Sequence, residues 1–150
     1  MILESLLAYA HFLAILGMVV FLSAEAVLCR PQWLNAAVVE RLGKVDLIYG
    51  IAAGAVLLTG VLRTWLGMKG AAWYWTNPLL HLKLTLFVVI GLISIKPTLL
   101  FVRWRRQLRS GGALPDEAQI GTARRWVMVQ AHLLPLIPLA AVFMARGYGK

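Results

Sequence analysis

The sequence is poor in cysteine and in acidic residues. Its one cysteine, Cys29, leaves no internal disulfide, and six acidic residues stand against fifteen basic ones. Charged residues make up 14% of the chain and hydrophobic residues 61%, with a mean hydropathy of +0.78. Soluble domains are about 25% charged and about 45–50% apolar. The composition therefore argues against an ordinary soluble domain and predicts an integral membrane protein. Cys29 is interpreted as a small buried residue, with a redox or metal-binding thiol as the alternative.

Four apolar runs are long enough to cross a bilayer, because about 20 helical residues span roughly 30 Å of hydrocarbon. We predict an all-α, integral membrane four-helix bundle that forms a single domain over residues 1–150. The predicted spans cover residues 5–28, 45–66, 79–102 and 126–145. Glu4 precedes the first run, which has no basic start, so that run is interpreted as a retained span rather than a cleaved signal.

Prolines and small residues predict local features of these spans. Pro97 predicts a kink or an early end of the third span, and two prolines, Pro135 and Pro138, predict a bend in the fourth. Gly50 and Gly54 have the spacing that lets helix backbones approach closely. Packing within the bundle is favoured for them, with a homodimer as the alternative. Between the first two spans, Leu34, Val38 and Leu42 are expected on one face of a short interfacial helix.

The basic residues predict the orientation in the membrane. Nine of them lie in the segments that follow the first and third spans, which are on the same side of the membrane. Four lie on the other side, around the loop between the second and third spans and at the end of the chain. By the positive-inside rule, both termini are expected outside, on the periplasmic or extracellular face of a bacterial inner (cytoplasmic) membrane. Because the basic residues gather at the ends of apolar runs, we expect anionic lipid headgroups as partners rather than nucleic acid.

All three histidines, His11, His81 and His132, lie inside predicted spans. Ionisable residues there are costly, and they indicate functional sites. His11 is six residues into the first span and His81 about three into the third, and these two spans run in the same direction. At 1.5 Å per residue their depths differ by about 5 Å, so the two imidazoles are expected near the outer face at one level. His132 is predicted nearer the cytoplasmic side.

Metal or haem ligation is the predicted use of this histidine pair. A b-type haem needs one or two axial ligands and an apolar pocket between helices. A zinc site needs about four ligands, which are not evident, and copper is the alternative cofactor. His132 is a candidate for a second centre or for a hydrogen bond. Lys83 lies about 200° around the helix from His81, so if it faces inward it could hold a haem propionate.

A second polar cluster is predicted on the inner side. Glu25 is fourteen residues after His11 and therefore shares its helix face, and Asp46 begins the second span at a similar depth. Arg124 and Arg125 lie near the start of the fourth span. An ion pair that locks the helices is favoured, and a proton relay or a clamp on a charged substrate group is the alternative.

Two stretches carry a resemblance to known families. Leu80–Leu84, with His81 and Lys83, resembles the Leu-His-x-Lys-Leu stretch of the HemJ-type protoporphyrinogen oxidases, and Ala10-His11 matches a histidine near the start of their first span. CopD-like membrane domains are distantly similar. The whole chain, including its ending 144–149, resembles an uncharacterised family of small bacterial four-span membrane proteins. The HemJ-type resemblance implies haem-related roles for His11 and His81, and a catalytic or haem-supporting role for Lys83.

The leading hypothesis is therefore a haem b membrane protein with a redox role. If it is an enzyme, a haem-dependent membrane oxidoreductase is expected, with the HemJ-like oxidase as one form; the redox partner is not indicated. The alternative is a non-catalytic bundle that binds a protein partner or lipid, with histidines that form hydrogen bonds between helices. A small transporter is a third reading, and it would need a dimer to form a pathway.

Overall fold

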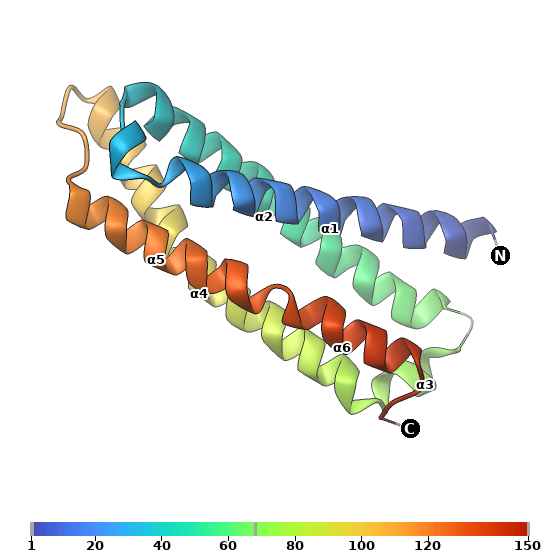
Figure 1. The fold of residues 1–150 in the computed structure, drawn as a ribbon. Coiled ribbons are helices and arrows are strands. Elements are labelled where there is room, and N and C mark those ends of the chain that lie inside the picture. Colours follow the sequence, from blue (N-terminus) through green and yellow to red (C-terminus); the bar gives the residue numbers. More distant parts are fainter. Residues whose placement is uncertain (1, 68, 150) are drawn as a thin grey trace.

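The computed structural model describes residues 2–67 and 69–149, which form an α-helical bundle (Figure 1). The elements in chain order are α1 (Ile2–Leu28), the 3-10 helix η1 (Pro31–Trp33), α2 (Ala36–Leu66), α3 (Ala71–Trp75), α4 (Pro78–Arg109), α5 (Glu117–Leu133) and α6 (Leu136–Ala145). Four helical stretches are long and apolar enough to span a membrane, with α5 and α6 forming the fourth. The predicted class, an all-α membrane bundle of four spans, is confirmed.

The helices form two layers, with α1 packed on α2 and α4 packed on α5 and α6 (Figure 1). Contacts of α2 with α4 and of α1 with α5 join the layers, which leaves α1 and α4 diagonally opposite. Both chain ends lie together with α3 at one end of the bundle, here called the terminal end. The opposite end, here called the basic end, carries η1 and the connection between α4 and α5.

Three helices extend well beyond the predicted spans, among them α5, which begins at Glu117 rather than at residue 126. The α2 helix begins at Ala36, after the side chain of Asn35 accepts a hydrogen bond from the Val38 N–H at 2.9 Å, which caps the helix. Val38 and Leu42 are buried in the core, so the predicted separate interfacial helix is wrong. The α4 helix continues through the buried Pro97 to Arg109 rather than ending early.

The predicted bend in the fourth span is confirmed. The chain leaves the helical pattern at Leu134 and Pro135, and α6 starts at Leu136. Proline removes one backbone donor and its ring crowds the preceding turn, which accounts for the break. Gly50 and Gly54 lie exposed on α2, with no atom within 4 Å of a Cβ built at either position, so the predicted packing within the bundle is wrong for them.

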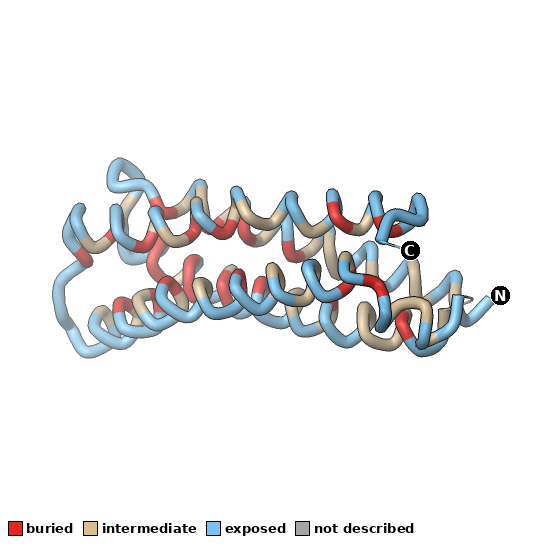
Figure 2. Tube along the Cα trace, turned by 90° about the horizontal axis from the view of Figure 1, so that it is seen from below, coloured by how far each residue is buried: buried red, intermediate tan, exposed pale blue. Residues whose placement is uncertain are grey.

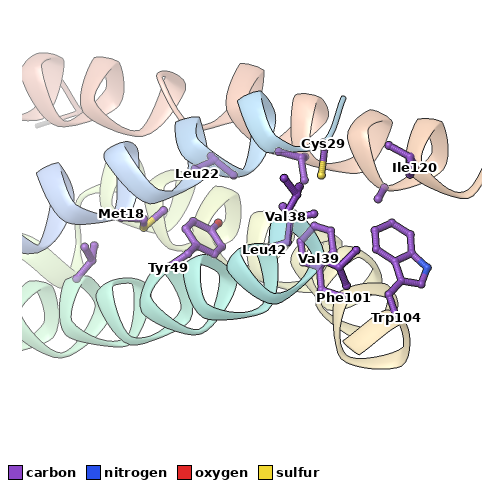
Figure 3. Close-up of a cluster of buried hydrophobic side chains, with 13 residues drawn as sticks. Met18, Leu22, Cys29, Val38, Val39, Leu42, Tyr49, Phe101, Trp104 and Ile120 are labelled. Atoms are coloured by element: carbon purple, nitrogen blue, oxygen red, sulfur yellow. The ribbon is translucent and has the colours of Figure 1, made fainter. Parts of the chain in front are cut away.

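The buried core lies mainly toward the basic end (Figure 2). In α1 the buried residues are Met18, Leu22 and Glu25, all in the second half of the helix. Phe101 and Trp104 of α4 are fully buried, with ring centroids 5.6 Å apart, and they anchor the cluster drawn in Figure 3. The α1 and α6 helices diverge toward the terminal end (Figure 1), where α1 has few buried residues. Dense packing therefore fixes the bundle at the basic end.

An ion-pair network extends the bundle beyond the apolar spans at the basic end. The Glu40 carboxylate on α2 accepts hydrogen bonds from Arg105 Nε at 3.0 Å and from Arg109 at 2.9 and 3.0 Å, both on α4. Gly43, one turn after Glu40, leaves the space that the Arg105 side chain occupies. These contacts tie the start of α2 to the end of α4.

A buried hydrogen bond joins the two layers within the core. The Tyr49 hydroxyl on α2 donates to Gln130 Oε1 on α5 at 3.0 Å, and both side chains are buried. We expect Tyr49→Phe to lower the free energy of unfolding by about 1–3 kcal/mol, because a buried acceptor loses its partner. Unfolding in detergent measures the effect. Tyr9→Phe, at an exposed position on α1, is the matched control, and an equal loss in both variants would contradict the prediction.

Candidate functional site

His11 lies half-buried on α1 and is held by α2. Its Nδ1 lies 2.7 Å from the Thr59 hydroxyl oxygen, and Thr59 in turn donates its hydroxyl hydrogen to the Ala55 carbonyl at 2.6 Å. Because Thr59 uses its hydrogen on that carbonyl, its oxygen accepts from the His11 Nδ1–H. This arrangement leaves His11 Nε2 as the nitrogen with a free lone pair. The ring packs on Gly60, where a built Cβ would lie 3.2 Å from His11 Cε1.

Two cations lie within electrostatic range of His11. Arg63 is one turn after Thr59 on α2, and Lys83 comes from α4. Both are half-buried, and they also lie within electrostatic range of each other. Within the described residues, neither forms an ion pair with a carboxylate. Two positive charges therefore lie near the His11 imidazole, in the part of the bundle toward the terminal end.

His81 has a different environment from His11. It is exposed, and its Nε2 donates to the Trp75 carbonyl at 2.9 Å, since a carbonyl can only accept. The ring also meets the Trp75 indole edge-on, with centroids 6.3 Å apart. Lys83, two residues on, is the inward-facing member of the pair. The side chains of His81 and His11 thus have separate partners, although Lys83 shows that this part of α4 lies near the level of His11.

His132 is exposed on α5, where its Nδ1 donates to the Met128 carbonyl of the same helix at 2.6 Å. Its interaction is therefore local, and it brings no second helix into contact. Across residues 2–67 and 69–149, no group of three or more His, Cys, Asp or Glu side chains converges as a metal site would require. The donor set thus offers single imidazoles rather than a multi-ligand cage.

The predicted inner cluster brings its two acids together. Glu25 of α1 and Asp46 of α2 are both buried and lie within electrostatic range of each other. Asp46 Oδ1 accepts a hydrogen bond from the Thr98 hydroxyl of α4 at 2.8 Å. Tyr49 and its partner Gln130 complete the polar surroundings. Glu25 and His11 both have polar neighbours on α2, as their shared helix face predicts.

The two arginines of this cluster behave differently from the predicted helix-locking ion pair. Arg124 Nη1 donates to the backbone carbonyls of Ala26 at 2.6 Å and Cys29 at 3.5 Å, and Arg125 is exposed. Within the described chain, neither forms an ion pair with Glu25, whose two carboxyl oxygens have no hydrogen-bond partner. Arg124 therefore binds the backbone carbonyls at the end of α1, and it does not neutralise the buried Glu25.

Cys29 follows α1 and is fully buried. Burial, together with the nearby Glu25, raises the pKa of its thiol to about 12. A thiol needs its thiolate form to act as a nucleophile or metal ligand, so this environment makes Cys29 unreactive near neutral pH. It supports the interpretation of Cys29 as a packing residue.

Several residues of both sites were missed by sequence reasoning. Thr59, Gln130 and Thr98 are ordinary polar residues in apolar helices, and no spacing ties them to their partners on other helices. Arg63 carried a usable signal, because it follows Thr59 by four residues and the two therefore share a helix face.

The four apolar helices and the charged side chains held among them define an integral membrane helical bundle. The chain belongs to the family described as Predicted membrane protein (DUF2214), which matches residues 3–149. This agrees with the predicted membership in a family of small four-span membrane proteins. No curated protein and no solved structure matches the chain.

Proposed function

We propose that the protein binds a b-type haem in the half of the bundle toward the terminal end, and that it has a redox role. The observation that carries the proposal is the hydrogen bond from His11 Nδ1–H to Thr59, which leaves Nε2 free as a ligand atom. Histidines that bind metals usually donate their other ring N–H in this way, which orients the ring. A bound haem would supply one-electron chemistry that side chains lack.

The surrounding residues fit the other needs of a haem. Its propionates are anionic, and Arg63 and Lys83 place two cations near His11. Its macrocycle is apolar, and the exposed side chains that follow His11 on α1 include the apolar Phe12 and Leu13. His81 remains the candidate second ligand, because its Nε2–H donates to the Trp75 carbonyl and its Nδ1 therefore carries the free lone pair. We therefore assign His11 as the principal ligand, with copper at this histidine as the alternative cofactor.

One optical experiment tests this proposal. Protein purified from haem-sufficient cells is expected to show a Soret band, with sharper visible bands after reduction, and a pyridine haemochrome spectrum of b type. Metal analysis of the same sample separates iron from copper. Colourless protein that shows no spectral change when hemin is added would contradict haem binding.

Anionic lipid binding at the basic end is a second candidate function. Arg105, Arg106 and Arg109 line a hollow of about 430 Å³ together with Val102 and Ser110. Within the described residues Arg106 has no ion pair, whereas its two neighbours share Glu40. Basic pockets beside membrane helices suit lipid headgroups. With the loops at this end facing the cytoplasm, as we propose, they would meet the anionic inner leaflet.

A lipid-retention measurement checks this second candidate. In nanodiscs of mixed phosphatidylcholine and phosphatidylglycerol, the protein is expected to retain phosphatidylglycerol after mild detergent extraction, as measured by mass spectrometry. Arg106→Gln should reduce that retention about threefold or more, since each basic residue near a membrane contributes about 1 kcal/mol. Arg146→Gln, at the terminal end, is the control, and equal retention in both variants would count against the site.

A further inference from the structure

Glu25 is the most unusual buried group in the protein that the haem proposal does not use. It lies in the last turn of α1 and is 1% exposed, and neither of its carboxyl oxygens has a hydrogen-bond partner. Carboxylates inside membrane bundles usually pair with a base or a donor. Glu25 therefore needs a neutralising species that its own neighbours do not provide.

The groups around Glu25 come from every element that packs on this part of α1. The α2 helix contributes the Asp46 carboxyl and the Tyr49 hydroxyl, both within electrostatic range of Glu25. The α5 helix contributes Arg124, whose guanidinium is bound to backbone carbonyls. The Cys29 thiol follows α1 itself. The charged group that acts electrostatically on Glu25 is thus another acid, Asp46, and Arg124 is already bound to backbone carbonyls.

Two neighbouring carboxyl groups in an apolar environment cannot both be ionised, because repulsion and lost hydration both oppose the second charge. Asp46 has a donor, since the Thr98 hydroxyl binds its Oδ1 at 2.8 Å. Glu25 has none. A proton on Glu25 removes the charge and supplies the donor that the pair lacks. A metal ion would need further ligands, and the described residues hold no group of three or more His, Cys, Asp or Glu side chains that could bind one.

We propose that Glu25 and Asp46 form an intramembrane proton-binding site, in which Glu25 is protonated at neutral pH and exchanges its proton with water at the basic end. Uptake forms an O–H bond on a Glu25 carboxylate oxygen with a proton from water, and release restores the carboxylate and returns that proton. This site is separate from the proposed haem site, because Glu25 lies fourteen residues, or about 21 Å of helix, from His11.

A route for the proton lies at the surface next to α1. A hollow of about 280 Å³ is lined by Arg30, Trp33 and Arg124 together with Pro31 and Gln32. Arg124 reaches from this hollow to the carbonyl of Ala26, the residue after Glu25. Movement of this one side chain would bring water from the hollow to the end of α1. The apolar core thus separates the acid pair from water on one side, and the hollow at the basic end brings water near it on the other.

Infrared spectroscopy of the purified protein tests the proposal. At neutral pH the wild type is expected to show the carbonyl stretch of a protonated carboxylic acid, and this band should move in D₂O because the proton exchanges with water. Glu25→Gln should remove the band, whereas Glu40→Gln, at the ion-paired glutamate, should leave it. Asp46→Asn should shift the band, because the proton's neighbour changes from a carboxyl group to an amide.

Each opposite result overturns the proposal. No acid band in the wild type at neutral pH would mean that Glu25 is ionised, and a band that does not respond to D₂O would exclude exchange. A band that disappears when sodium or potassium chloride replaces choline chloride would assign the site to a metal cation. If Glu25→Gln fails to fold, the wild-type spectra in H₂O and D₂O and the spectrum of Asp46→Asn still decide, because none of them requires that variant.

Discussion

His11→Ala is expected to abolish the Soret band of the purified protein, with a loss of haem affinity of at least about 100-fold. A bound haem would lose the imidazole proposed to hold it. Thr59 could not take its place, because a hydroxyl is a weak ligand and this one is already bound to the Ala55 carbonyl. The measurement is hemin titration of haem-free protein, followed by optical spectroscopy at equal protein concentration.

The other histidines provide the comparison for this variant. His132→Ala should leave the band unchanged, because His132 bonds within its own helix. His81→Ala should shift the band if His81 is the second ligand, and should leave it unchanged if His11 acts alone. Thr59→Val should weaken haem binding about 10-fold through loss of ring orientation. A Soret band that survives His11→Ala with unchanged affinity would contradict the assignment of His11.

The bundle itself was largely predictable from the sequence, because bilayer thickness fixes the length of an apolar span. The four spans, and the bend at Pro135, follow from apolar runs and from the chemistry of proline. The ends were harder to predict. Asn35 caps α2 well before the apolar span begins. Val38 is buried in this added stretch, so packing rather than hydropathy extends the helix.

The depths of the candidate site residues along their helices were predictable from the sequence, but the directions in which their side chains point were not. Rise per residue predicts His11 and His81 near one level, and the structure brings Lys83, two residues after His81, within electrostatic range of His11. The rotation of each helix about its axis depends on the packing of the whole bundle, which no local pattern records. That rotation turns Lys83 inward and leaves His81 bound to Trp75. Thr59 was missed for the same reason.

The inner cluster shows how a charge count can mislead. Glu25 and two arginines suggested an ion pair, since a buried acid usually finds a base. The end of α1, however, leaves backbone carbonyls without intrahelical donors, and Arg124 satisfies two of them. An arginine near a helix end thus has two competing partners, and composition cannot rank them.

The double variant Arg63→Gln, Lys83→Gln is expected to weaken haem binding about 100-fold while the optical bands keep their positions. Hydrogen bonds to charged groups contribute about 1.5–3 kcal/mol each, and tenfold in affinity corresponds to about 1.4 kcal/mol, so two lost contacts suffice. His11, the proposed ligand, is untouched, which is why the spectrum of bound haem should not change. Transfer of haem to an excess of apomyoglobin measures the loss.

A matched variant separates a local effect from a general loss of positive charge. Lys69→Gln with Lys96→Gln removes the same charge from lysines that lie over Trp73 and Trp126 instead, and it should bind haem as the wild type does. Removing Arg63 takes a positive charge from the side with fewer basic residues, so membrane orientation should be kept. Equal weakening in both double variants would show that Arg63 and Lys83 do not hold the propionates. In that case the cations near His11 would serve only the packing of the bundle.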